Sequence, residues 1–283
     1  MARPLARRRL ALVVLCALVL VHLAAFGLYT QRDRQSQLLT LYLDARDQWK
    51  AGHLELAARE YGEFLAARDR AAWPLVLLRA FPDAASGWFA LGRVETERGR
   101  VDAALVAFER AMALEPGRGR REYRELLLES GRGAALAAFA RRELAADPAS
   151  ALAAKDLGAA LLATGDPAGA ARAYEAALRA VPAFLARHDP AFQGGLSSQE
   201  ADLLNLLSVA VRLAGDRERA DAVCEGLTRR QPRAGHLDRL CRAYLCADRG
   251  DAAGARDQLA GYQPPAPEHE ALARALAARL GAR

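Results

Sequence analysis

The sequence predicts an all-α fold, a solenoid in which helical pairs stack one on the next. Six glycines are separated by 47, 32, 34, 50 and 35 residues, and they are Gly52, Gly99, Gly131, Gly165, Gly215 and Gly250. This spacing indicates a repeat of about 34 residues. A unit of that length cannot bury its own apolar face, so it depends on its neighbours.

The residues around these glycines predict a helix, a tight turn and a second helix. Gly165 tolerates a positive φ after one helix, Asp166 supplies an acceptor for free amides, and Pro167 suits a first helical position. Gly215 and Gly250 are likewise followed by aspartate. Each glycine is therefore expected to separate two helices.

Aligning the chain on the glycines brings further residues into register. The clearest unit, 85–118, contains Trp88, Leu91, Gly92, Ala104, Phe108 and Pro116. The unit 151–184 contains Leu157, Gly158, Ala170, Tyr174 and Pro182 at matching places. These residues resemble the W-x2-L-G…A-x3-F…P pattern of the tetratricopeptide repeat. Glu95 departs from the family pattern, which has an aromatic residue there.

The resemblance implies a right-handed α-solenoid over residues 38–283. Six repeats are expected near 38–71, 85–118, 117–150, 151–184, 201–234 and 236–269. The third repeat is degenerate, because Arg124 stands where a small residue is usual. A capping helix is expected at 268–281.

Two long glycine intervals predict insertions. Residues 72–84 are apolar, and they form either a short helix over the joint between repeats or an exposed patch that meets lipid or a partner. Residues 185–200 are expected to form an irregular loop, after which Ser197 and Glu200 have the spacing of a capping box.

The repeated residues have packing roles. A small residue in the first helix allows the second helix to approach closely, and an aromatic residue in the second helix fills the space between repeats. Proline ends that second helix. We therefore expect Tyr61, Trp88, Phe108 and Tyr174 to lie in the core, the alternative being contact with a ligand.

The N-terminal segment predicts a membrane anchor. Residues 10–29 contain no Asp, Glu, Lys or Arg, and twenty helical residues span roughly the 30 Å hydrocarbon core. Arginines precede this stretch, so we expect a cytoplasmic segment at 1–9, a transmembrane signal anchor at 10–30, and a linker at 31–37. The solenoid would then lie in the periplasm of a bacterium, tethered to the inner membrane. The alternative is a cleaved signal peptide and secretion to the periplasm.

The net charge does not indicate nucleic-acid binding. The formal charge is +6, and Arg3, Arg7, Arg8 and Arg9 contribute four of it, which leaves 6 − 4 = +2 for the rest of the chain. Nucleic-acid binding requires a clustered basic face, so no nucleic-acid partner is expected. Only two lysines occur, which is typical of GC-rich bacterial coding.

The cysteines outside the predicted anchor leave two interpretations open. Cys224, Cys241 and Cys246 are either buried small apolar residues, which we favour, or two of them, Cys224 and Cys241, form a disulfide between adjacent repeats. Cys241 and Cys246 point about 140° apart on one helix, which disfavours a mutual bridge. No zinc-binding spacing is present, and no metal or cofactor is expected.

Catalytic motifs are absent from the sequence. The five histidines are scattered, Gly131-Arg132-Gly133 lacks the strand and the third glycine of a dinucleotide fingerprint, and His188-Asp189 lies in a predicted loop. We therefore expect neither an enzyme nor a small-molecule substrate.

The resemblance implies that the first helix of each repeat lines the binding surface. By spacing, this selects Tyr42, Arg46, Phe89, Arg93, Arg121, Lys155, Asn205, Arg212 and Tyr244. Arginine forms forked contacts with carboxylates and aromatic rings stack on apolar groups, so the surface suits an acidic peptide. The alternative is a solvated face with incidental arginines, and the family's carboxylate clamp of lysines and asparagines is not reproduced.

The predicted function is that of a membrane-anchored scaffold or adaptor. It would bind a protein or peptide partner on the extracytoplasmic side and help to assemble an envelope complex such as a secretion, pilus, cytochrome-maturation or outer-membrane assembly system. Two alternatives remain: a chaperone-like module for exported proteins near the translocon, and an accessory subunit of an enzyme complex or an enzyme with an unseen site.

Overall fold

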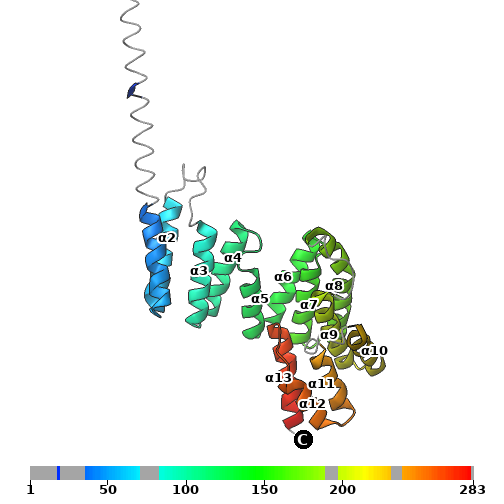
Figure 1. Ribbon diagram of the computed structural model, residues 1–283. Helices are drawn as coiled ribbons and strands as arrows, with labels where there is room; N and C mark the ends of the chain where they lie inside the picture. The colour runs from blue at the N-terminus through cyan, green and yellow to red at the C-terminus, as the bar shows by residue number, and fades with distance from the viewer. Residues whose placement is uncertain (1–17, 20–35, 71–82, 189–196, 231–237, 282–283) are drawn as a thin grey trace, which may run out of the picture. The chain divides into compact units, whose positions relative to one another are not determined.

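The computed structural model describes residues 18–19, 36–70, 83–188, 197–230 and 238–281. Within these ranges every regular element is a helix, as Figure 1 shows. The chain divides into two compact units, residues 1–123 and 124–283. The boundary falls inside helix α5 (Arg120–Glu129).

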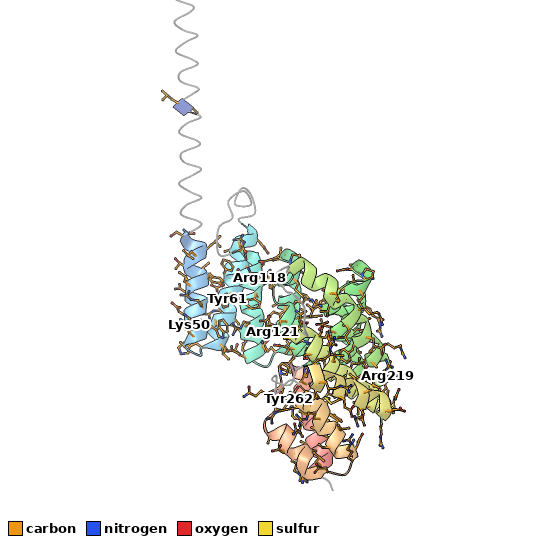
Figure 2. The ribbon with its side chains drawn as sticks, turned by 45° about the vertical axis from the view of Figure 1, so that its right-hand side comes forward. Lys50, Tyr61, Arg118, Arg121, Arg219 and Tyr262 are labelled. Atoms are coloured by element: carbon orange, nitrogen blue, oxygen red, sulfur yellow. A yellow bond between two sulfur atoms is a disulfide. The ribbon has the colours of Figure 1, made fainter. Side chains whose placement is uncertain are left out.

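The first unit begins with a helix over residues 36–50, two residues before the predicted start of the repeats. It continues with α2 (Leu54–Arg70), α3 (Ala84–Glu97) and α4 (Val101–Leu114), and α3 packs against both α2 and α4 (Figure 1). Tyr61 is fully buried among these helices (Figure 2), and Phe64 beside it is buried too. Trp88 is half-buried against the same core.

The second unit contains the remaining helices of the described chain. They are α6 (Gly133–Ala146), α7 (Ala151–Ala163), α8 (Pro167–His188), α9 (Ser198–Leu213), α10 (Arg217–Arg230), α11 (Arg239–Asp248), α12 (Ala252–Ala260) and α13 (Pro267–Gly281). Sequential helices from α6 to α10 pack on one another, α11 packs on α12, and α11 also contacts α9. Figure 1 shows α13 alongside α11 and α12.

The six glycines end helices as the sequence predicts. All six adopt positive φ, from 71° at Gly131 to 97° at Gly215. At Gly165 the following Asp166 accepts a hydrogen bond from the backbone N–H of Gly169 at 2.8 Å, which caps α8. The prediction of a helix, a turn and a second helix is confirmed at each glycine.

The small residues of the repeat allow an aromatic ring to approach the first helix closely. A Cβ added at Gly92 would lie 2.6 Å from the ring of Phe108, and one added at Gly158 would lie 2.5 Å from the ring of Tyr174. Phe108 and Tyr174 are both buried, as predicted. Glycine is therefore required at these places for lack of space, not for its φ.

Glu95, which replaces the usual aromatic residue, is bound by an arginine. Arg98 donates to the Glu95 carboxylate at 2.6 Å and also pairs with Glu55 on α2. Glu95 is 7% exposed, so the pair is largely withdrawn from water. Ion pairs thus tie the turn after α3 to α2 at the place where the family pattern has an aromatic residue.

The prediction that proline ends the second helix is wrong at Pro182, because α8 continues past it to His188. Proline removes one backbone donor, and the buried Val181 beside it holds the helix in the core. Residues 72–82 of the first insertion lie outside the described residues. The capping box of Ser197 and Glu200 is confirmed, with the Glu200 amide donating to Ser197 Oγ at 3.1 Å.

The predicted membrane span at 10–30 lies outside the described residues, apart from Leu18 and Val19. None of the helices that the structure describes is long and apolar enough to cross a bilayer.

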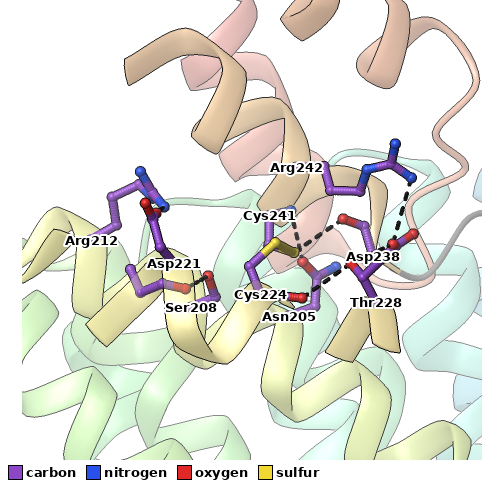
Figure 3. Close-up of a disulfide and its surroundings, with 10 residues drawn as sticks. Asn205, Ser208, Arg212, Asp221, Cys224, Thr228, Asp238, Cys241 and Arg242 are labelled. Atoms are coloured by element: carbon purple, nitrogen blue, oxygen red, sulfur yellow. Dashed lines mark hydrogen bonds and ion pairs between the residues drawn. A yellow bond between two sulfur atoms is a disulfide. The ribbon is translucent and has the colours of Figure 1, made fainter. Parts of the chain in front are cut away.

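A disulfide joins Cys224 on α10 to Cys241 on α11, with their Cα atoms 5.8 Å apart (Figure 3). The interpretation favoured above, in which all three cysteines are reduced, is therefore corrected, whereas Cys246 is free as expected. Around the bridge, Asn205 Oδ1 accepts from the Cys241 amide at 3.0 Å and Thr228 donates to Asp238 at 2.9 Å. The bridge connects two adjacent repeats.

Breaking this disulfide should lower the stability of the second unit. The cysteines are 17 residues apart in sequence, and closing a loop of that size stabilises a fold by about 3 kcal/mol. The double variant Cys224→Ala/Cys241→Ala should unfold at a lower temperature in circular dichroism, while Cys246→Ala serves as the matched control. Equal melting temperatures for all three proteins would contradict the assignment.

Adding one methyl group at Gly158 should be destabilising. Gly158→Ala forces the buried Tyr174 ring to move, which costs about 1–3 kcal/mol. Gly226→Ala in α10 meets no atom within 4 Å and should raise stability by about 0.5 kcal/mol. Thermal unfolding of the two variants should shift in opposite directions, and a shift of the same sign in both would refute the packing argument.

Candidate functional site

The nine residues predicted to line a binding surface all lie on the first helix of a helical pair. We call the surface that these first helices form the first-helix face. In the first unit the predicted residues are Tyr42, Arg46, Phe89, Arg93 and Arg121, and in the second they are Lys155, Asn205, Arg212 and Tyr244. The two groups have different surroundings.

The aromatic residues of the first unit are anchored by other rings. Tyr42 contacts Tyr61 and Phe64 edge-on, with ring centroids 5.5 and 5.4 Å apart. Phe89 packs against Phe108 at 6.1 Å. Tyr42 and Phe89 are each half-buried, so one part of each ring is fixed in the core and another part reaches the surface.

Two arginines lie beside these rings. The Arg46 side chain is 42% exposed and forms an ion pair with Asp47 at 3.3 Å. The exposed Arg93 stacks 4.7 Å over the ring of Trp49, and Trp49 donates to Glu97 at 2.8 Å. Stacking occupies the plane of the guanidinium and leaves its edge available for forked hydrogen bonds. We call Tyr42, Arg46, Trp49, Phe89 and Arg93 the arginine–aromatic face.

The charges of this face converge on its tyrosines. Burial raises the pKa of Tyr42, and the positive charges of Arg46 and Arg118 oppose that increase. Burial likewise raises the pKa of Tyr61, and Arg46 and Arg93 oppose it. Arg46 thus lies close enough to both tyrosines to act on their ionisation. Arg118 lies just before α5 and pairs with Glu115 at 2.6 Å. The exposed Arg121 lies in the first turn of α5 (Figure 2).

In the second unit the predicted residues are bonded within the chain. Lys155 pairs with Asp202 and with Glu268 at 3.3 Å. Asn205 accepts from Cys241, and Arg212 pairs with Asp221 and, at 2.8 Å, with Asp248. Tyr244 donates to the carbonyl of Leu272 on α13 at 3.1 Å. All four residues are thus bonded to internal partners, and two of them, Lys155 and Tyr244, contact α13.

A buried ionic cluster lies at this place. It consists of Arg124, Lys155, Asp156, Asp202, Glu268 and His269. The guanidinium of Arg124 lies 3.1 Å from Glu268 and 3.6 Å from Asp156, and His269 Nε2 lies 2.7 Å from Asp202. Three carboxylates thus face two fixed cations and one histidine. Because desolvated charges are stable only when paired, the cluster holds the first turn of α13 in place.

The cluster shifts the acidity of its carboxylates. Burial alone would raise the pKa of Asp202, but the contact with His269 and the charge of Lys155 lower it to about 2. Burial also opposes the lowering at Glu268, where Lys155 and Arg124 hold the pKa below its ordinary value. Both carboxylates are therefore ionised at neutral pH.

Sequence reasoning found Lys155 but missed its partners. Arg124 was visible as a large residue at a place for a small one, and the structure gives the reason, since its side chain reaches Glu268 on α13. The roles of Glu268 and His269 carried no signal in the sequence, because they depend on contacts with residues far away in the chain.

The cluster should make the stability of the second unit sensitive to acid. A carboxylate whose pKa falls from 3.8 to about 2 on folding contributes about 2 kcal/mol above pH 4, and this contribution is lost as the pH falls through 2. Between pH 5 and pH 2, wild type should therefore lose about 2 kcal/mol more stability than Asp202→Asn in urea denaturation. The exposed control Glu218→Gln should keep the wild-type pH dependence, and parallel curves for wild type and Asp202→Asn would contradict the paired state.

Similar folds occur among solved structures. A tetratricopeptide repeat protein from Parabacteroides merdae aligns with a TM-score of 0.57 at 16% identity, over 87% of this chain and 86% of that one. MamA from Desulfovibrio magneticus aligns with a TM-score of 0.46 at 16% identity, over 70% of this chain and 96% of the other. Kinesin light chain repeats from Podospora anserina align with a TM-score of 0.47 at 17% identity, over 70% and 95%.

No protein-family model matches this chain, and no curated protein sequence matches it either. The first alignment covers most of both chains and carries the assignment of the fold, while the TM-scores of the other two are too low to support an argument. Together with the glycine turns and the ring-on-glycine packing in the repeats, it leads to one conclusion: the chain has the tetratricopeptide-repeat fold.

Proposed function

We propose that this protein is a scaffold that binds a protein partner on the arginine–aromatic face of its first unit. The observation that carries the proposal is the contrast between the two units. Arg46 and Arg93 are at least partly exposed beside anchored rings, whereas the predicted residues of the second unit are bonded internally. Exposed arginines and anchored aromatic residues are the groups that dominate binding energy in protein interfaces.

The partner segment is acidic and also carries apolar side chains. Arginine pairs with carboxylates through two parallel hydrogen bonds, which gives affinity and orientation together. Arg46 and Arg93 lie on neighbouring first helices, so two carboxylates of one partner segment can be bound at once. The surface parts of Tyr42 and Phe89 lie beside them and provide the apolar contact.

We also propose that the protein is tethered to the inner membrane by residues 10–30, with its repeats in the periplasm, where it would serve the assembly of an envelope complex. The uncharged stretch at 10–29 supports the tether. The disulfide supports the compartment, because such bonds persist in oxidising environments such as the periplasm. Secretion after cleavage of the same segment is the alternative.

Photo-crosslinking tests the binding face. A photoreactive phenylalanine analogue at Phe89 in the full chain should crosslink one stoichiometric partner in native membranes. The same analogue at Val106, which is exposed on the second helix of that repeat, should not. Arg46→Ala/Arg93→Ala should reduce the Phe89 crosslink at least tenfold, and the exposed Arg59→Ala should leave it unchanged.

The outcomes of this experiment separate the functional classes. Absence of any crosslinked protein at Phe89, or equal yields at Phe89 and Val106, would refute the scaffold proposal. Crosslinking to many unrelated exported proteins would instead favour a chaperone-like module. High salt should weaken binding of the expected acidic partner, since exposed ion pairs are screened.

A further inference from the structure

Helix α13 lies on the first-helix face of the second unit. Its Glu268 pairs with Lys155, its Leu272 carbonyl accepts from Tyr244, and Leu276 and Leu280 are buried in one apolar cluster with Val209. Lys155, Val209 and Tyr244 belong to the first helices α7, α9 and α11. A segment of the chain itself thus occupies the surface that corresponds to the partner-binding face of the first unit.

The polar end of α13 is closely matched to this surface. Glu268 stands in the first turn and reaches Arg124 at 3.1 Å and Lys155 at 3.3 Å, while the neighbouring His269 lies 2.7 Å from Asp202. Arg124, Glu268 and His269 are each more than nine-tenths buried. The surface therefore recognises an acidic residue at the start of a helix.

Beside this cluster, the small apolar side chains of α13 do not fill the space between α13 and the helices α5 and α7. A cleft of about 450 Å³ remains between α13 and the pair α5 and α7. Leu128, Leu162 and Ala163 line one wall, and Ala271 and Ala275 of α13 line the other. Both alanines are exposed, so α13 presents methyl groups where the surface has room for larger side chains. Such a gap forfeits packing energy.

We propose that this surface is a second partner-binding site, and that α13 is its resident internal ligand. The partner is an amphipathic helix with an acidic residue in its first turn and leucine-sized or aromatic side chains three and seven positions later. These are the places of Glu268, Ala271 and Ala275, which share one face of a helix. The inference rests on the proposed scaffold function and assigns it a second site.

Exchange of α13 for such a helix leaves no buried charge without a partner. The acidic residue of the incoming helix takes the place of Glu268, so Arg124 and Lys155 remain paired. The segment before α13 contains the exposed Pro264 and Pro265, and Tyr262 anchors the chain just ahead of them. Because α13 is tethered, its effective concentration is high, and the competing helix gains its advantage by filling the cleft.

The test uses the full chain with a protease site inserted between Gln263 and Pro264. After cleavage, the segment 264–283 is held only by its contacts, and a fluorescent peptide of the same sequence is the probe. The peptide should exchange into the cleaved protein. Its Ala271→Leu/Ala275→Leu variant should compete at about tenfold lower concentration, since each leucine adds three apolar carbons to the cleft, and Glu268→Ala should compete at least tenfold less well.

A matched control separates the cleft from general hydrophobicity. The Ala277→Leu/Ala278→Leu peptide adds the same carbons at exposed positions outside the lining of the cleft and should compete like the native peptide. In the uncleaved chain, Ala275→Leu should raise the melting temperature and Ala277→Leu should not.

Three results would overturn the proposal. The first is a cleaved chain that never exchanges residues 264–283 for the peptide, or that unfolds and does not refold when the peptide is added. Either outcome would make α13 a permanent part of the core. The second is equal competition by all four peptides. The third is a dimer of uncleaved chains with exchanged α13, which would assign the surface to a second copy. The Phe89 crosslink reports on the first unit alone, so the two proposals can fail independently.

Discussion

In the repeats 85–118 and 151–184 the two helices depend on one close contact, in which an aromatic ring of the second helix fills the space left by a glycine on the first. At Gly92 and Gly158 there is no room for even one methyl group between the helix and the ring. Where glycine is replaced by Ser208, the hydroxyl donates to the carbonyl of Ala220 at 2.9 Å, so a hydrogen bond holds the two helices together. This contact fixes the two helices of such a repeat against each other, and the candidate binding residues lie on the first helix of a pair.

The predicted binding positions on the first helices have different surroundings in the two units. In the first unit Arg46 and Arg93 meet water and aromatic rings, and in the second unit Lys155 and Tyr244 meet α13. Electrostatics explains the difference in part. The second unit concentrates Asp156, Asp202 and Glu268 around its cations, and charges that are desolvated together must be paired. In the first unit Arg46 and Arg93 stay at least partly exposed, so water hydrates part of each side chain.

The sequence was sufficient for those features that depend on local chemistry. The glycine turns, the buried Tyr61, Phe108 and Tyr174 and the capping box at Ser197 all follow from spacing within one repeat. Features that depend on distant residues could not be derived in this way. Arg124 and Glu268 are 144 residues apart, and neither residue alone indicates the other. Pro182 was misjudged because its effect depends on whether the packing of the whole helix outweighs one missing hydrogen bond.

The bridge between Cys224 and Cys241 has a consequence for the way in which the chain opens. Stacked repeats lose structure from their ends inward, since a terminal repeat has a neighbour on one side only. By linking α10 to α11, the covalent bond fuses the last two helical pairs into one cooperative block that cannot fray stepwise. The end of the chain that carries α13 is thereby held covalently to the rest of its unit, and reduction of the bridge would remove this link.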